Sequence, residues 1–464
     1  MASLVDAYIE TNHDRLLGEL KSFLKIPSIS TLPQHRHDIE RACGFLVEKL
    51  LAAGMKNVQR IIADGHPIVY GEWMGAPGKP TVLCYGHYDV QPPDPLNEWA
   101  SPPFEPDLRE QNLYARGAAD DKGQMYIHLK AAEALLAVRG TLPVNLKFLI
   151  EGEEEVGGRA VDRYVRENPE PLACDVALIS DTEMFAPGLP TLCIGLRGLV
   201  YTEVVASGAY QDLHSGLFGG AAPNPLLGLA QILSQLVSPA YQIQIPGFYD
   251  DVEPPSPEEK ASWAALPFSE EEFLREVGSP ALVGEAGYGV LERRWARPTL
   301  ELHGFVGGFQ GAGSKTVIPA RASAKVSMRL VPKQNPQKIL AAFEQEVQRL
   351  TPPGLRVQVR VLSSGEPILM PPSHPYIQAA SQALAETFEK DTVYIRSGGS
   401  IPIVALFQDL LHVPVVLMGF GLPDDRLHSP NEKFYLPNFY DGIRAVTRFW
   451  GHLAELPPRS PSAA

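Results

Sequence analysis

The sequence predicts an α/β protein in which one domain, a mostly parallel sheet flanked by helices, is interrupted by a smaller ferredoxin-like α+β domain. Two observations carry this prediction. Short apolar runs alternate with amphipathic stretches over the first 200 or so residues, which is typical of strand–helix–strand units. The expected elements then change to the order strand, helix, strand, strand, helix, strand, which is the ferredoxin-like order. We therefore expect residues 1–198 and 364–464 to form the first domain and residues 199–363 the inserted one.

The apolar runs of the first domain are expected to be buried strands, because a parallel strand covered on both faces has a nearly continuous hydrophobic sequence. These runs are Pro67–Trp73, Pro80–Val90, Val144–Glu151, Cys174–Asp181 and Val413–Gly419. The amphipathic stretches predict helices, two of which end at a glycine suited to a left-handed cap. The predicted helices are Ser3–Leu24, Asp38–Ala53, Lys122–Arg139, Pro375–Glu389 and Pro437–Leu453.

The inserted domain is expected to contain two helices that begin at proline, a residue favoured in the first helical turn. These helices are Pro225–Val237 and Pro336–Leu350, and the predicted strands are Leu199–Ala206, Thr299–Val306, Arg321–Val331 and Leu355–Leu362. Residues 238–298 are rich in proline and glutamate and predict an excursion with short helices.

Composition limits the function classes. The 464 residues have a net charge of −14, and such a field repels phosphate backbones and anionic lipids, so neither nucleic acid nor membrane is an expected partner. The N-terminal stretch is interrupted by Asp6, Glu10 and Asp14, which favours an amphipathic helix over a secretory signal. The cysteines show no close-paired spacing. These features predict a cytoplasmic protein.

Histidine and acidic residues gather where predicted strands end, which is where α/β sheets place ligands. His87 and Asp89 follow a buried strand two residues apart, so both side chains point the same way if the strand continues. His87 can then bind a metal while Asp89 fixes its ring. The alternative is a strand-end histidine that is simply hydrogen-bonded to a carboxylate.

Two aspartates, Asp120 and Asp121, precede a predicted helix. Capping the helix is the expected role of Asp121, since aspartate is favoured at the N-cap. Asp120 lies in a glycine-flanked turn, from which its two oxygens could bridge two cations.

A third segment places four glutamates directly after a buried strand: Glu151, Glu153, Glu154 and Glu155. An acidic loop is one explanation, but such crowding is unfavourable unless cations neutralise it. Asp181 ends another strand, and His428 lies in a polar loop. Together these residues supply imidazoles and carboxylates suited to paired divalent zinc, manganese or cobalt.

The segments G-H-Y-D-V-Q-P, R-G-A-A-D-D-K-G, E-G-E-E-E-V-G, S-D and H-S-P-N-E strongly resemble the two-metal peptidases of the carnosinase, aminoacylase and acetylornithine deacetylase family, in that family's order. The segments D-L-H-S-G-L-F-G-G, S-K-T-V-I-P, M-R-L-V-P and S-G-G-S-I-P look closest to its carnosinase and cytosolic non-specific dipeptidase branch. The resemblance covers nearly the whole chain.

This resemblance implies a role for each matching residue. His87 and Asp181 would bind one metal ion, Glu155 and His428 a second, and Asp120 would bridge the two. Glu154 would be the general base and Asp89 the carboxylate that supports His87. In the family's E-G-x-E-E pattern, Glu153 takes the variable position. Zinc is the implied metal, with manganese or cobalt as alternatives.

The resemblance also implies that the inserted domain is a lid and dimerisation domain of a homodimer with shared active sites. His214, Thr316, Arg329, Gly399 and Ser400 match substrate-binding positions, and His214 would also stabilise the oxyanion. Stabilising a turn is the alternative role for His214. The implied reaction is hydrolysis of dipeptides or short peptides with a free C-terminal carboxylate, through a metal-bridging water and Glu154.

Two other functions remain open at this stage. An N-acyl amino-acid hydrolase of the deacetylase or desuccinylase type would use the same metals and the same arginine. A catalytically silent binding protein on this scaffold is the remote alternative. A two-metal phosphoesterase is disfavoured by the order of the motifs.

Overall fold

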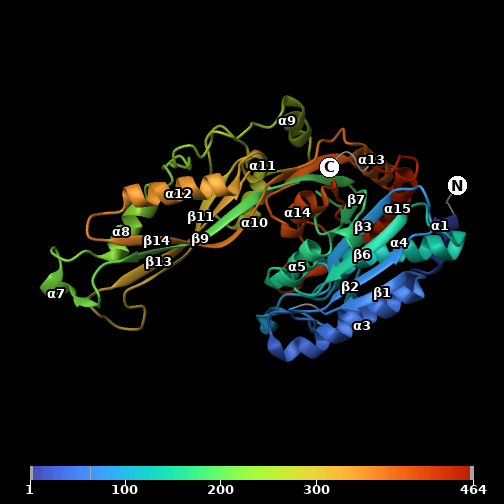
Figure 1. The fold of residues 1–464 in the computed structure, drawn as a ribbon, viewed down its shortest axis with the longest axis horizontal. Helices are drawn as coiled ribbons and strands as arrows, with labels where there is room; N and C mark the ends of the chain where they lie inside the picture. Colours follow the sequence, from blue (N-terminus) through green and yellow to red (C-terminus); the bar gives the residue numbers. More distant parts are fainter. Residues whose placement is uncertain (1–3, 63, 460–464) are drawn as a thin grey trace. The chain divides into compact units, whose positions relative to one another are not determined.

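The computed structural model describes residues 4–62 and 64–459 (Figure 1). The chain divides into two compact units. The first unit comprises the described residues up to Ile194, together with Met370–Ile395 and the segment from Leu406 onward. The second comprises Gly195–Leu369 and Arg396–Ala405, so a short segment from beyond residue 364 joins the central part of the chain.

A nine-stranded mixed sheet runs in the order β1-β2-β6-β3-β7-β17-β8-β15, with β16 also paired to β8. The strands are β1 Lys56–Ile61, β2 Ile68–Trp73, β3 Thr81–His87, β6 Asn145–Glu151, β7 Val176–Ile179, β8 Thr191–Leu196, β15 Ile368–Leu369, β16 Val393–Ser397 and β17 Val415–Leu417. The central neighbours β6, β3, β7 and β17 are parallel, whereas the pairs β1–β2, β2–β6, β17–β8 and β15–β8 are antiparallel. The mostly parallel sheet predicted from the sequence is therefore wrong. The connection between β1 and β2 is too short for a crossover, and that pair is antiparallel.

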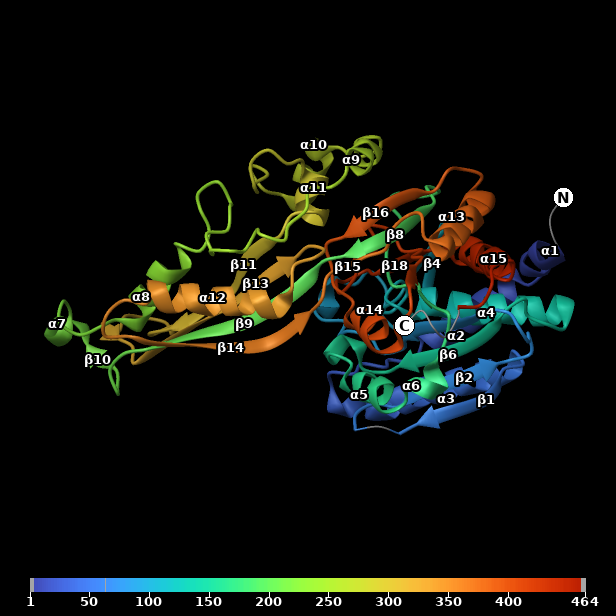
Figure 2. The ribbon, with the colours of Figure 1, turned by 45° about the horizontal axis from the view of Figure 1, so that its top comes forward.

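Helices from both ends of the chain pack together in the first unit (Figure 2). They are α1 Leu4–Thr11, α2 His13–Leu24, α3 Arg36–Ala52, α4 Lys122–Arg139, α5 Arg159–Glu167, α6 Pro169–Leu172, α13 Pro375–Phe388 and α15 Leu436–Leu453. The single helix predicted from residue 3 to residue 24 is two helices separated at Asn12, and Ser3 lies outside the described residues. Helix α4 packs on α1, α2, α15 and β3, and its end at the left-handed Gly140 agrees with the predicted cap.

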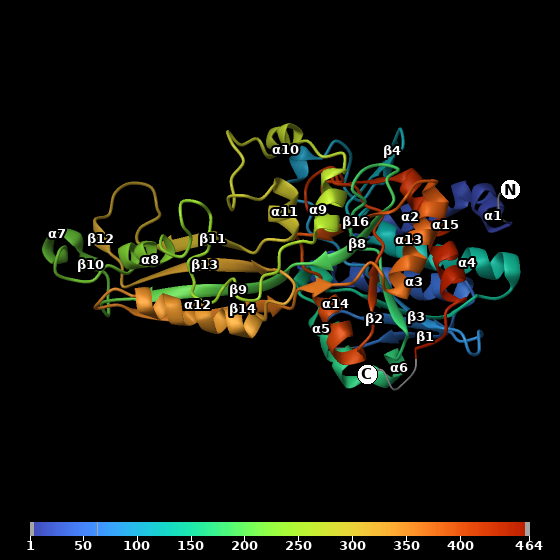
Figure 3. The same cartoon turned by 90° about the horizontal axis from the view of Figure 1, so that it is seen from above.

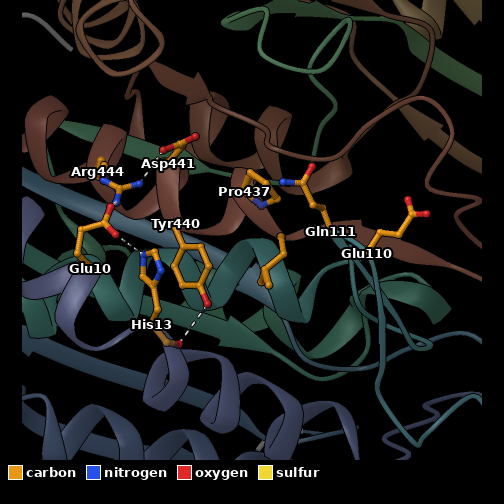
Figure 4. A pocket seen from close by; sticks show the side chains of 9 residues that line it. Glu10, His13, Glu110, Gln111, Pro437, Tyr440, Asp441 and Arg444 are labelled. Atoms are coloured by element: carbon orange, nitrogen blue, oxygen red, sulfur yellow. Dashed lines mark hydrogen bonds and ion pairs between the residues drawn. The ribbon is translucent and has the colours of Figure 1, made fainter.

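Figure 4 shows how α2 meets α15 at a surface hollow of the first unit. The His13 ring stacks on Tyr440 with ring centroids 3.7 Å apart, and the Tyr440 hydroxyl donates to the His13 carbonyl oxygen at 3.1 Å. Arg444 on α15 forms ion pairs with Glu10 and Asp441. These contacts join α1 and α2 to α15. None of the predicted site residues lines the hollow.

Small elements complete the described part of the first unit. The strands β4 Asp107–Arg109, β5 Asn112–Tyr114 and β18 Lys433–Tyr435 form a three-stranded sheet. Short helical turns lie at Pro33–His35, Leu96–Glu98, Glu154–Val156 and Phe407–Leu411. Among the helices of residues 4–62 and 64–459, none combines the length and apolar character needed to span a bilayer.

The second unit is built on a four-stranded antiparallel sheet in the order β11-β13-β9-β14 (Figure 3). Its strands are β9 Gly198–Ser207, β11 Thr299–Gly307, β13 Arg321–Leu330 and β14 Arg356–Gly365. Helices α8 Pro225–Leu233 and α12 Pro336–Leu350 pack on the sheet and on each other, and bury the unit's own core. This is the ferredoxin-like arrangement of strands and helices.

The remaining elements of the second unit are short. A two-stranded sheet pairs β10 Leu213–His214 with β12 Val317–Ile318. The short helices are α7 Ser215–Phe218, α9 Pro257–Ala264, α10 Glu270–Val277, α11 Val290–Trp295 and α14 Pro402–Leu406. Helices α9 to α11 lie within residues 238–298, where the sequence predicts an excursion with short helices.

Candidate active site

Parallel pairing brings the predicted site segments to one edge of the sheet. His87 ends β3 and is the register partner of Glu151 at the end of β6. Asp181 follows β7, which is parallel to β3. Because the carboxyl ends of parallel strands meet at the same edge, residues distant in the sequence become neighbours there.

Two groups of side chains at this edge could each hold a metal ion, and both contain Asp120. The first group is His87, Asp120 and Asp181, and the second is Asp120, Glu155 and His428. Asp120 Oδ1 lies 3.1 Å from His87 Nε2, and Asp120 Oδ2 lies 2.9 Å from His428 Nε2. Glu155 Oε2 lies 3.3 Å from the same His428 nitrogen.

Asp89 contacts both His87 and the turn that carries Glu154 and Glu155. Its Oδ1 lies 3.3 Å from His87 Nδ1, opposite the ring nitrogen that faces Asp120. The same carboxylate accepts hydrogen bonds from the backbone N–H groups of Glu154 and Glu155, each at 3.2 Å. Asp89 therefore fixes the His87 ring and positions the turn that presents the two glutamates.

The three consecutive glutamates have different surroundings. Glu153 accepts hydrogen bonds from the backbone N–H of His66 at 2.8 Å and of Ala160 at 2.6 Å, so its carboxylate is held by the backbone. The pKa of Glu154 is raised to about 7, chiefly by burial; His87 opposes the rise, and repulsion from Glu155 and Asp120 contributes to it. A carboxylate with a pKa near neutrality can both accept and return a proton.

The electrostatics of the cluster fit bound cations. Burial and the negative charge of Asp120 raise the pKa of Asp181 well above its usual range. Hydrogen bonds with Asp120 and Glu155 raise the pKa of His428 to about 10. Asp121 Oδ1 is buried with no hydrogen-bond partner among the described residues. Imidazoles and crowded buried carboxylates form a donor set that suits divalent metal ions.

The capping role expected for Asp121 is wrong. Its side chain makes no capping hydrogen bond to α4. Instead, Asp121 Oδ2 accepts a hydrogen bond from the backbone N–H of His87 at 3.2 Å. The turn brings Asp121 back against the end of β3, so its carboxylate supports the position of His87 rather than the helix.

Sequence reasoning missed Glu432, which lies in the quoted H-S-P-N-E segment. This buried carboxylate accepts hydrogen bonds from the backbone N–H groups of Gly117, Ala119 and Asp120 at 2.9, 3.0 and 3.1 Å. It also pairs with Arg116 Nη1 at 2.7 Å. Glu432 thus holds the turn that carries Asp120.

The substrate-binding positions predicted in the second unit form two separate groups. Arg329 Nη1 donates to Ser400 Oγ at 2.9 Å, and the Gly399 carbonyl oxygen accepts from the Arg197 backbone N–H at 3.1 Å. In the other group, His214 is paired with Val317, next to Thr316, whose carbonyl oxygen accepts from Ser215 N at 3.1 Å. His214 is exposed, and its Nδ1 accepts from Gly216 N at 3.0 Å.

These two groups lie at opposite ends of the ferredoxin-like sheet. Arg329 is near the C-terminal end of β13, whereas His214 and Thr316 adjoin its beginning at Arg321, where Gly208 N donates to Ala320 O at 3.0 Å. Eight residues of extended strand separate the ends by about 26 Å. A dipeptide extends over only about 7 Å. One copy of this unit therefore cannot contact a single dipeptide with both groups.

The sheet is mixed, two candidate metal groups lie at its strand ends, and the half-buried Glu154 beside them has a raised pKa. This combination is typical of metal-dependent hydrolases. The chain belongs to peptidase family M20/M25/M40, which it matches over residues 83–452. It is therefore a peptidase, an enzyme acting on peptide bonds.

Relatives of known activity agree with this assignment. The chain is 34% identical to Cys-Gly metallodipeptidase DUG1 of Candida albicans, over 94% of each chain. It is 32% identical to human Beta-Ala-His dipeptidase, over 97% of this chain and 92% of the relative. The solved structure of the dipeptidase Dug1p from Saccharomyces cerevisiae covers 98% of each chain with a TM-score of 0.83 and 30% identity. These similarities confirm the predicted metallodipeptidase class.

Proposed function

We propose that this enzyme hydrolyses dipeptides and short peptides that carry a free C-terminal carboxylate, using two divalent metal ions in each subunit. The observation that carries the proposal is the position of Asp120, whose two oxygens each face one of two imidazoles. A carboxylate shared by two ligand groups is suited to bridging two cations. Single-metal hydrolases have no need for it.

His87 and Asp181 would hold one ion, Glu155 and His428 the other, and Asp120 both. Zinc suits the mixed imidazole and carboxylate donors, and manganese or cobalt could replace it. Such ions polarise a scissile carbonyl and make an attacking water more acidic. Asp89 supports this set by holding the Nδ1 side of His87.

Glu154 is the proposed general base. Its raised pKa lets it take a proton from the attacking water and deliver it to the leaving amine nitrogen. His214 would donate a hydrogen bond to the carbonyl oxygen as negative charge develops there. Since His214 Nδ1 already accepts from Gly216, the ring's Nε2 is left to carry the proton.

Recognition of the substrate's carboxylate is assigned to Arg329 and Ser400, with Gly399 shaping the loop and Thr316 contacting the peptide. Arg329 and Ser400 already share a hydrogen bond in the second unit. A guanidinium beside a hydroxyl matches the donors that a carboxylate requires.

The ferredoxin-like unit would be a lid and a dimerisation domain inserted into the catalytic domain, and His214 would serve the partner's active site. His214 and Arg329 lie at opposite ends of the sheet, about 26 Å apart. One copy of the unit therefore cannot bring both residues to the same dipeptide, which supports the proposal that His214 acts in the partner's site. The edge strand β11 also exposes apolar side chains, with Leu302 51%, Phe305 40% and Val306 60% exposed. Exposed apolar edge strands are suited to pairing with another chain.

A cytoplasmic location is proposed as well, supported by the cysteines Cys43, Cys84 and Cys174, for which the structure shows no disulfide. Fractionation of the native host's cells tests this proposal. Recovery of the protein in a secreted fraction would contradict it.

A substrate screen tests the proposed reaction. Purified protein is assayed with zinc, manganese and cobalt against dipeptides, their C-terminal amides, and N-acetyl and N-succinyl amino acids. We expect hydrolysis of dipeptides far above the rest. Preferred cleavage of the acylated amino acids would replace this proposal with the acylase function, and no hydrolysis with any metal would favour a binding protein.

A further inference from the structure

Arg197, between β8 and β9, carries a buried nitrogen that nothing satisfies. Its Nη1 has no hydrogen-bond partner among the described residues. Buried polar atoms of proteins are nearly always hydrogen-bonded, and a guanidinium has five N–H donors to satisfy. An unpaired donor of a charged group is therefore the kind of atom that a ligand would bind.

The rest of Arg197 is fastened to the proposed carboxylate-binding loop. Its Nε donates to the Gly398 carbonyl oxygen at 3.0 Å. Its backbone carbonyl accepts from Ser400 Oγ, the same oxygen that accepts from Arg329 Nη1. The free end of Arg197 is thus held close to the group that would take the substrate's α-carboxylate.

The positive charges here repel one another. The pKa of Arg197 is lowered to about 10, chiefly by burial and also by the charges of Arg329 and Arg294, while the charge of Glu301 opposes the shift. No carboxylate among the described residues forms an ion pair with Arg197 or Arg329. Arginines held close together, with no carboxylate paired to Arg197 or Arg329, favour binding of an anion.

A cavity of about 240 Å³ adjoins this cluster. Its wall includes Arg197, Arg294 and Thr299, and Thr299 is the register partner of Arg329 across β11 and β13. A further arginine in the wall, Arg297, is neutralised by Glu285 in a two-bond ion pair at 2.6 and 2.7 Å. Arg197 differs from Arg297 in that its Nη1 has no hydrogen-bond partner among the described residues, and only the more distant charge of Glu301, in the same wall, offsets its own.

We propose that Arg197 is a specificity-determining residue that binds an acidic side chain on the C-terminal residue of the substrate. This inference rests on the proposed dipeptidase function. Arg329 and Ser400 take the α-carboxylate, and Arg197 takes the second carboxylate from within the cavity. The preferred substrates are then dipeptides ending in glutamate or aspartate.

Kinetics with two substrates of nearly equal shape test this proposal. Ala-Glu and Ala-Gln differ mainly in the charge of the C-terminal side chain. We expect the wild-type enzyme to prefer Ala-Glu in kcat/KM by about tenfold or more, chiefly through KM, as a charge-assisted pair implies. Arg197→Met should remove the preference, and Arg197→Lys should keep part of it. Arg321→Met, which changes an exposed arginine on β13, is the matched control and should leave the preference unchanged.

The alternative role for Arg197 is to hold the Gly398–Ser400 loop and nothing more. In that case Arg197→Met would lower kcat/KM for Ala-Glu and Ala-Gln by the same factor. That result, or a wild-type enzyme without preference between the two substrates, would overturn the proposal.

A binding measurement separates this inference from the proposed reaction. Calorimetric titration with L-glutamate and with L-glutamine requires no hydrolysis. Tighter binding of glutamate that depends on Arg197 supports the anion site even if no dipeptide is cleaved, in which case only the proposed reaction fails. Equal binding of the two amino acids contradicts the anion site, whatever the enzyme hydrolyses.

Discussion

Asp120 Oδ1 lies 3.1 Å from His87 Nε2, and Asp120 Oδ2 lies 2.9 Å from His428 Nε2. The two histidines come from positions more than 300 residues apart in the chain, and this one carboxylate connects them. The turn that carries it is held by Glu432, which accepts three backbone hydrogen bonds. The position of Asp120 is thus fixed by Glu432, which belongs to neither ligand group.

The first prediction concerns the general base. Glu154→Gln should keep both metal ions yet lower kcat by two to four orders of magnitude or so, because an amide cannot accept the proton. Metal content by mass spectrometry and turnover of Ala-Ala measure the two effects.

The neighbouring glutamates are the controls. Glu155→Gln should lose metal, and Glu153→Gln should chiefly affect stability, since Glu153 binds the backbone N–H groups of His66 and Ala160. A metal-replete but inactive Glu153→Gln, beside an active Glu154→Gln, would move the base to position 153.

The second prediction concerns the carboxylate end of the substrate. Arg329→Ala should reduce kcat/KM for dipeptides about a hundredfold, because a charge-assisted pair to the α-carboxylate is lost. The C-terminal amides of the same dipeptides lack this charge and should be affected far less. Equal losses on acids and amides would show that Arg329 does not bind the carboxylate.

The third prediction concerns His214 and the partner subunit. His214→Ala and Glu154→Gln should each be nearly inactive alone, but random mixing of their subunits should restore roughly a quarter of wild-type activity. Half of the dimers are then hybrids, and each hybrid contains one site that combines an intact Glu154 with the other chain's intact His214. Mixing that forms hybrids, verified by differently tagged chains, yet restores nothing would place His214 in its own subunit's site.

The fourth prediction concerns stability at acidic pH. Burial lowers the pKa of His128 to about 3, whereas an exposed histidine titrates near 6.5. Between these pH values His128 binds a proton in the unfolded chain but not in the folded chain. The contribution of His128 to the free energy of unfolding is therefore complete above about pH 6.5 and is lost as the pH falls.

From pH 7 to pH 5 this loss amounts to about 2 kcal/mol in the free energy of unfolding. His128→Asn, which retains a polar group near Ser180, should have a correspondingly weaker pH dependence. Urea unfolding of both proteins at the two pH values measures the difference. An identical pH dependence would mean that His128 is not a source of acid sensitivity.

Much of the fold follows from local sequence signals. Helix α4 has the predicted bounds, because its largely buried helical run ends at a glycine that adopts the left-handed cap. Strand β1 was missed because it is an exposed edge strand with the polar sequence KNVQRI. The break between α1 and α2 was also missed, since both helices continue one amphipathic pattern through Asn12.

The site could be predicted only in part. His87 and Asp181 lie at strand ends, and parallel strands bring such ends together without further information. Glu432 contacts a turn more than 300 residues away, and the unpaired nitrogen of Arg197 depends on what surrounds it in the folded unit. Neither property leaves a local pattern in the sequence.

The number of metal ions bound per chain tests the central claim, that Asp120 joins two ligand groups into one two-metal centre. Protein prepared without chelators and supplied with zinc, manganese or cobalt is analysed by native mass spectrometry. We expect two ions per chain in the wild type, one after His428→Ala, and loss of both tightly bound ions after Asp120→Ala. A wild-type chain that binds a single ion with every metal, or an Asp120→Ala variant that retains two, would contradict the account.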